Sequence, residues 1–179
     1  MKSVTSIFLL LMFFCSNAYS QLSADKIFES FKQGERTNCS SIAFIKAALN
    51  VYGLDNLFVT EKVNDTTYKI TLKNSASFNL KNDELNKAKF SADFVFIKEN
   101  CESEKITDYA VLTYAVMAKY KQIIDKRSTF DKALEDLEEG EVYTPTIYKY
   151  LGFKEGKEIQ KLKRESGSEY CGVVAWSTA

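Results

Sequence analysis

The chain has 179 residues, with 24 basic and 24 acidic side chains and no histidine. This balance argues against nucleic acid as a partner, because such proteins carry a basic excess. The missing imidazoles and widely spaced cysteines also argue against a zinc site. The length, a single proline and seven glycines suit one domain without linkers.

The first 20 residues have the pattern of a secretory signal peptide. Lys2 is their only charge, and an apolar run covers Ile7–Phe14. Small residues near Ser20 predict cleavage before Gln21, so we expect a secreted or periplasmic protein with its domain over residues 21–179. The run is too short to span a membrane. Lipidation at Cys15 is the less favoured alternative, because a bulky residue precedes it.

Two helices are predicted next. Apolar residues at helical spacing predict a short amphipathic helix over 22–31, ending near Gly34. A second helix follows Cys39 and continues to Tyr52, with Gly53 as its C-terminal stop. Because it is apolar almost all round, we expect this helix to be buried at the centre of the domain.

The following segment changes to a period of two. Alternation over 57–73, with a turn at Asn64–Asp65, predicts a β-hairpin that is half exposed. A further short strand is predicted over 77–80. Phe94–Ile97 is predicted as a buried strand or a packed turn.

The C-terminal part is predicted to be mainly helical. Thr107 is expected to cap a helix that continues to Ile124, and a second helix is expected over Ser128–Gly140. A short helix over 144–152, a charged solvated segment over 154–168 and a β-type run at Tyr170–Trp176 complete the prediction of an α+β fold.

Three cysteines follow the signal segment: Cys39, Cys101 and Cys171. An odd number in an oxidising compartment implies one free thiol or an intermolecular bridge. We favour a disulfide between Cys101 and Cys171, which leaves Cys39 free. A structural disulfide that includes Cys39 is the alternative.

The placement of Cys39 carries the strongest chemical signal. It stands where a loop becomes an apolar helix, and the free N–H groups and positive dipole of a helix start favour a nucleophilic thiolate. Asn38 is expected to be the N-cap of this helix. The alternative is that Cys39 is a small buried hydrophobic residue.

The segment Gln33 to Ala48 resembles papain-like cysteine peptidases, and calpain-like catalytic domains are the nearest family. Gln33, Gly34 and Cys39 match the spacing of that family's motif. The resemblance implies Cys39 as nucleophile and Gln33 as oxyanion-hole donor, at the start of a central helix packed on an antiparallel sheet. Asn38 stands where an acidic residue is usual, and Ser40 replaces a bulky aromatic.

The end of the chain adds a weaker point of resemblance. Gly172–Trp176 is similar to the approach to the strand that carries the family's histidine, and Ser177–Ala179 occupy the place where that histidine is expected. The resemblance therefore implies a peptidase domain with an incomplete C-terminal sheet, either inactive or truncated. Without a general base, peptide hydrolysis by this chain alone is not expected.

Two functions remain open from sequence. The first is an exported cysteine-peptidase-like domain that lacks its base. The second is a secreted or periplasmic binding or inhibitory module in which Cys39 is structural. A peptide or protein is the expected partner, and no cofactor or metal is predicted, since the acidic run Glu135–Glu141 is typical of a solvated helix face.

Overall fold

The computed structural model describes residues 22–138 and 144–154. The predicted signal peptide, the charged segment beyond Lys154, Cys171 and the predicted strand Tyr170–Trp176 lie outside these residues. Helices and small antiparallel sheets together confirm the α+β class, while the papain-like arrangement remains a prediction. In chain order the elements are α1 (Ala24–Phe28), β1 (Phe31–Gln33), α2 (Cys39–Tyr52), β2 (Phe58–Asn64), β3 (Thr67–Leu72), β4 (Ser77–Lys81), α3 (Asn82–Ala92), β5 (Phe94–Phe96), α4 (Cys101–Ile124), α5 (Phe130–Glu138) and the 3₁₀ helix η1 (Thr144–Leu151).

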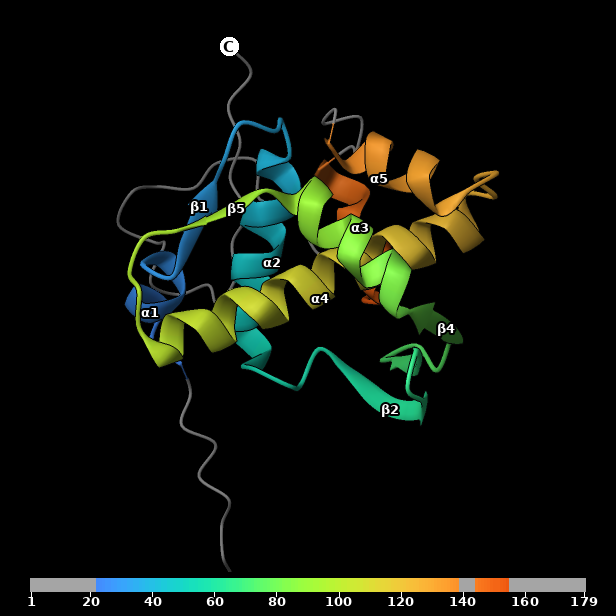
Figure 1. Cartoon of the computed structure of the whole chain (residues 1–179), viewed down its shortest axis with the longest axis horizontal. Helices are drawn as coiled ribbons and strands as arrows, with labels where there is room; N and C mark the ends of the chain where they lie inside the picture. Colours follow the sequence, from blue (N-terminus) through green and yellow to red (C-terminus); the bar gives the residue numbers. More distant parts are fainter. Residues whose placement is uncertain (1–21, 139–143, 155–179) are drawn as a thin grey trace, which may run out of the picture.

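Helix α4 occupies the centre of the described fold. It is 24 residues long and runs across the middle of the molecule, with α3 and α5 near one end and α1 at the other (Figure 1). Its buried positions include Ile106, Tyr114 and Met117, each fully shielded from solvent. The expectation that the Cys39 helix is central is therefore wrong. Helix α2 does form as predicted, but it packs beside α4, against α1, β1 and η1.

The start of α4 also differs from the prediction. The helix begins at Cys101, and Asn100 caps it by accepting hydrogen bonds from the N–H groups of Glu102 and Ser103 at 3.1 and 2.9 Å. Thr107 lies inside the helix, where its hydroxyl donates to the Ser103 carbonyl oxygen at 2.8 Å. The charged first turn hides the start, because it lacks the apolar spacing that predicts a helix.

A three-stranded antiparallel sheet follows α2. Strands β2 and β3 pair as the predicted hairpin, and β4 adds to β3 on the other side. Ile70, Leu72 and Leu80 turn into the core and are at most 3% exposed. Helix α3, which the sequence analysis missed, follows β4 directly and packs along α4.

A second, two-stranded sheet joins distant parts of the chain. Strand β1 pairs antiparallel with β5, and Phe31 lies opposite Phe96 in the register. The ring of Phe31 stacks on that of Phe94 with centroids 4.9 Å apart, and Phe94 meets Tyr114 of α4 edge-on. This sheet therefore connects the loop before α2 to the segment between α3 and α4.

A buried ion-pair network fixes the last described elements to α4. Lys121 Nζ lies 2.9 Å from an oxygen of Asp125 and 3.1 Å from an oxygen of Asp136 in α5. The hydroxyl of Tyr150 in η1 donates to Asp125 at 2.7 Å. Arg127 contacts Asp136 at 2.6 Å. Since each buried charge here has an opposite charge beside it, we assign this network a structural role.

Candidate functional site

Cys39 stands at the first position of α2, as the sequence predicts. Its side chain is exposed, and it forms no disulfide with Cys101, the other cysteine among the described residues. Cys101 is also exposed and free within residues 22–138 and 144–154, and its predicted partner Cys171 lies outside them. An exposed thiol at a helix start is chemically accessible. Ser40 follows it in the first turn and is half-buried.

The loop before Cys39 is held by hydrogen bonds of its own. The side-chain amide of Gln33 donates to the carbonyl oxygen of Arg36, which closes the loop locally. Arg36 pairs with Glu138 at the end of α5 at 3.0 Å, and the Thr37 hydroxyl donates to the Glu138 carbonyl oxygen. The amide nitrogen that the family resemblance assigns to an oxyanion hole thus has a structural partner in this loop.

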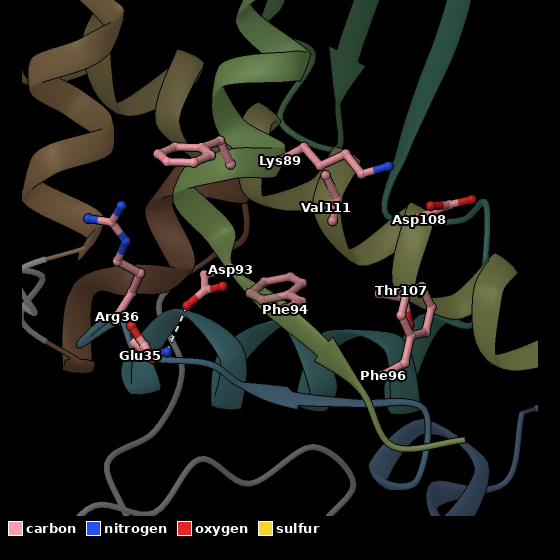
Figure 2. A pocket seen from close by; sticks show the side chains of 10 residues that line it. Glu35, Arg36, Lys89, Asp93, Phe94, Phe96, Thr107, Asp108 and Val111 are labelled. Atoms are coloured by element: carbon pink, nitrogen blue, oxygen red, sulfur yellow. Dashed lines mark hydrogen bonds between the residues drawn. The ribbon is translucent and has the colours of Figure 1, made fainter. Parts of the chain in front are cut away.

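Gly34 has a packing reason to be glycine. Its N–H donates to the Asp93 carbonyl oxygen at 3.0 Å, and the N–H of Glu35 donates to the Asp93 carboxylate at 2.7 Å, the bond drawn in Figure 2. A Cβ added at Gly34 would lie 2.5 Å from both the carboxyl carbon and the carbonyl oxygen of Asp93. Only glycine allows this close approach. The Gln-Gly pair therefore has an explanation that requires no catalysis.

Asn38 is the N-cap residue by position, but its side chain makes no capping hydrogen bond. It is fully buried, and its amide donates to the Ala92 carbonyl oxygen at 2.8 Å. The predicted capping role of this side chain is wrong, because the amide is turned into the interior, where its oxygen makes no hydrogen bond with any described residue. Asn38 therefore ties the start of α2 to the end of α3.

A small buried polar cluster lies beneath this helix start. The Tyr114 hydroxyl is close to the side chains of Ser91 and Asn38, but none of the three polar oxygens there makes a hydrogen bond of ordinary geometry among the described residues. Burial raises the pKa of Tyr114 to about 12, so the hydroxyl stays protonated at neutral pH. No sequence pattern predicted this cluster.

A groove of about 600 Å³ lies next to the loop. Side chains from α3, β5, α4 and the loop before α2 surround it, as Figure 2 shows. Its lining residues are Glu35, Arg36, Lys89, Phe90, Asp93, Phe94, Phe96, Thr107, Asp108 and Val111. Cys39 is not among them. Residues 35 and 36 reach the groove, but the thiol three positions further on does not line it.

Aromatic rings dominate the apolar part of this groove. Phe90 is 77% exposed and Phe96 is 42% exposed, which is unusual for phenylalanine. The Arg36 guanidinium carbon lies 5.5 Å from the centre of the Phe90 ring, a cation–π contact. Exposed apolar groups with a polar rim are typical of an interaction surface.

The rim of the groove carries charges of both signs. Arg36 and Asp93 have the partners described above. Glu35, Lys89 and Asp108, in contrast, form no ion pair with any residue in the described ranges 22–138 and 144–154. These three side chains are therefore available to a ligand. The sequence analysis missed the groove, because its lining residues come from four separate segments.

Helix α2 also carries a buried lysine. Lys46 is 8% exposed, and its ammonium group donates to the carbonyl oxygens of Phe28 and Phe31 at 3.0 and 2.5 Å. Burial lowers the pKa of Lys46. The ammonium group also sits over the rings of these two phenylalanines. These contacts fasten the end of α1 to α2, so we assign Lys46 a structural role.

The described residues hold no cluster of three or more cysteine or acidic side chains arranged for a metal ion. In the same part of the chain, no helix combines the length and the apolar character needed to cross a bilayer. Comparison of the chain with protein-family models, with curated proteins and with solved structures gave no match.

Proposed function

We propose that this chain is a peptide-binding domain, exported to the periplasm or the cell exterior, whose groove between α3, β5 and α4 receives an extended segment of a partner protein. The observation that carries this proposal is the groove itself. Its volume of about 600 Å³ falls in the range of ligand sites in proteins. Three phenylalanines contribute to its lining, and two of them are well exposed.

The charges at the groove favour a peptide over a purely apolar ligand. Lys89 supplies an ammonium group for a carboxylate, and Asp108 supplies an acceptor for a donor on the same ligand. Phe94 and Val111 supply apolar contacts in the same groove. We therefore expect a segment with an apolar side chain between an acidic one and a basic one.

A peptide-display selection tests this proposal. Random octapeptides are selected on the full chain, and the affinity of the best binder is measured by fluorescence anisotropy. Replacing Phe90 by alanine is expected to weaken binding about tenfold or more, as truncation of an aromatic anchor commonly does. Phe28→Ala is the matched control, because Phe28 is also a highly exposed phenylalanine but lies outside the groove. Equal losses in both variants, or no selected peptide, would overturn the proposal.

A second candidate function rests on Cys39. The thiol is exposed at the start of α2, and Gln33 and Gly34 precede it at the spacing of papain-like peptidases. We propose that, if the fold derives from such a peptidase, Cys39 is the retained nucleophile and reacts with electrophiles without hydrolysing peptides. The chain has no histidine to act as base.

An epoxide-bearing peptide probe tests this second candidate. Mass spectrometry after a short exposure should find the label on Cys39 and little on Cys101, and Cys39→Ser should abolish it. Cys101 is a demanding control, because it is equally a free, exposed cysteine at the first position of a helix. Equal labelling of the two cysteines would reduce Cys39 to an ordinary surface thiol.

A further inference from the structure

We infer that the bound peptide adds a strand to β5, at the edge that faces away from β1. This inference rests on the proposed peptide-binding function and specifies how the backbone of the partner is recognised. Addition of a strand to an exposed sheet edge is a general mode of peptide recognition, in which main-chain hydrogen bonds give much of the affinity. Three observations on β5 support it.

The first observation is an unpaired row of backbone groups. Among the described residues, β5 pairs only with β1. The N–H of Ile97 donates to Ser30 on the β1 side at 3.1 Å. Because backbone groups alternate in direction along an antiparallel strand, those of Phe94 and Phe96 point away from β1. Within residues 22–138 and 144–154, no hydrogen bond to them is present.

The second observation is that this edge borders the groove. In Figure 2, β1 runs along one side of β5, while Thr107 and Val111 of α4 lie on the other side. The side chains of Phe94 and Phe96 line the same groove. A peptide in the groove would therefore have the β5 backbone within its reach.

The third observation is the composition of the edge. Strand β5 and the residue after it are entirely apolar, and Val95, Phe96 and Ile97 are 40 to 47% exposed. The outer strand β2 of the other sheet instead carries charged residues at Glu61 and Lys62, which protect an edge from unwanted pairing. The β5 edge lacks this protection.

The charges of the lining narrow the partner to an extended peptide that carries both an acidic and a basic side chain, because the groove presents an ammonium group as well as carboxylates. Alternate side chains of an added strand point to one face. An apolar residue facing Phe94, an acidic residue reaching Lys89 and a basic residue reaching Asp108 would satisfy the apolar and the charged parts of the groove. Neither Lys89 nor Asp108 has an ion-pair partner within residues 22–138 and 144–154. A strand of this length pairs with only a few residues of the partner, which suits a short recognition segment.

Backbone N-methylation of the selected octapeptide is the decisive experiment. Strand addition predicts that N-methyl groups weaken binding about tenfold at alternate positions and have little effect at the positions between them, because only alternate N–H groups face β5. If the loss of affinity on N-methylation does not alternate along the peptide, strand addition is overturned. The peptide-binding proposal then remains intact, provided that Phe90→Ala still weakens binding. A failure to select any peptide would instead overturn the proposed function.

A protein variant and an exchange measurement complete the test. Phe96→Pro removes an outward N–H and should weaken binding about tenfold more than Phe96→Ala, which removes only the side chain. Hydrogen exchange at Phe94 and Phe96 should be fast in the free protein and slow with the peptide. Slow exchange without peptide at every protein concentration would mean that the chain itself covers the edge. Slow exchange only at high protein concentration would mean that a second copy of the chain covers the edge. Either result would overturn the inference.

Discussion

Two helices of this molecule begin with the same two residues and differ in what the asparagine does. Asn38 precedes Cys39 at the start of α2, and Asn100 precedes Cys101 at the start of α4. Both cysteines are exposed and free among the described residues. At the second start the asparagine caps two N–H groups, whereas at the first its side chain is buried and bound to Ala92.

The electrostatics of the two starts differ accordingly. The first turn of α4 contains Glu102 and Glu104, whose carboxylates lie near the positive end of the helix dipole. The first turn of α2 contains no acidic residue, and its N-cap side chain makes no capping bond. The two cysteines therefore differ in their neighbours: two acidic residues share the first turn with Cys101, and none shares it with Cys39. The comparison shows that the same Asn-Cys pair can begin two helices that differ in their capping and in the charge of their first turn.

The largest expected difference between the two starts concerns aspartate substitutions. Asn38→Asp removes the donor to the Ala92 carbonyl oxygen and buries a carboxylate, so it should lower the free energy of unfolding by about 3 kcal/mol or more. Asn100→Asp should change it by less than about 0.5 kcal/mol, because aspartate caps a helix as well as asparagine. Urea unfolding of both variants measures this. Similar values would mean that Asn38 is not held in the interior.

A smaller effect is expected for the loop that leads to the first start. Gly34→Ala should lower the free energy of unfolding by about 2 to 3 kcal/mol, because the new Cβ would overlap Asp93. Gly53→Ala is the control: its nearest neighbour would be 3.7 Å away, so only the strain of its positive φ of 79° remains. Because its ψ is 178°, this backbone conformation is open almost only to glycine, and the strain costs about 1 to 3 kcal/mol. Thermal unfolding measures both, and a loss below about 1 kcal/mol for Gly34→Ala would contradict the close approach at Gly34.

Alkylation rates compare the two thiols directly. At neutral pH, iodoacetamide should modify Cys39 about five- to tenfold faster than Cys101, because two acidic residues share the first turn with Cys101 and none shares it with Cys39. Peptide mapping over time gives the two rates in one sample. Replacing Glu102 and Glu104 together by glutamine should bring the ratio of the Cys39 and Cys101 alkylation rates closer to one. A faster reaction at Cys101 would reverse the electrostatic comparison.

The smallest expected change in stability is for removal of the Tyr114 hydroxyl, which lies beneath the start of α2. At pH 9, Tyr114→Phe should change the free energy of unfolding by less than about 0.5 kcal/mol, because its hydroxyl makes no ordinary hydrogen bond. Tyr109→Phe should cost about 1 kcal/mol, because the Tyr109 hydroxyl accepts from the Leu57 N–H at 3.1 Å. Urea unfolding distinguishes them, and a larger cost for Tyr114→Phe would imply an additional partner, such as a buried water.

The same tyrosines predict an alkaline transition. Burial raises the pKa of both Tyr109 and Tyr114 to about 12, against about 10 in an unfolded chain. The unfolded state therefore ionises first, so stability is complete below about pH 10 and declines as the pH rises to about 12. Each phenylalanine variant should lose less stability than the unmodified protein over this interval. Parallel pH profiles would contradict the assignment.

The sequence predicted those helices and strands that are determined by the spacing of nearby residues and by turn residues. Helix α2, its stop at Gly53 and the hairpin of β2 and β3 follow from spacing and turn residues, and all are confirmed. Helix α3 was missed because most of its residues are polar and only a narrow stripe that includes Ala88 and Ala92 is buried. The three-residue strand β1 is too short for a period to be visible.

The candidate site was harder to predict, for a physical reason. The buried position of Asn38 depends on Ala92, a residue 54 positions away, and no local rule relates them. The groove likewise combines the loop before α2 with α3, β5 and α4. Exposure of Phe90 cannot be inferred from a pattern that treats every phenylalanine as a core residue. The thiol position was predictable because a helix start is local.

The pairing of Phe31 with Phe96 has a consequence for folding and for binding together. The two-stranded sheet of β1 and β5 closes a loop that contains α2, the three-stranded sheet and α3. Its strand pairing is therefore a long-range contact, and forming it carries a substantial cost in chain entropy. The proposed peptide groove should therefore be absent from any fragment that lacks part of residues 31–111, and should appear only when this whole segment has folded. By linkage, a peptide at a hundred times its Kd would stabilise the entire fold by about 2.7 kcal/mol.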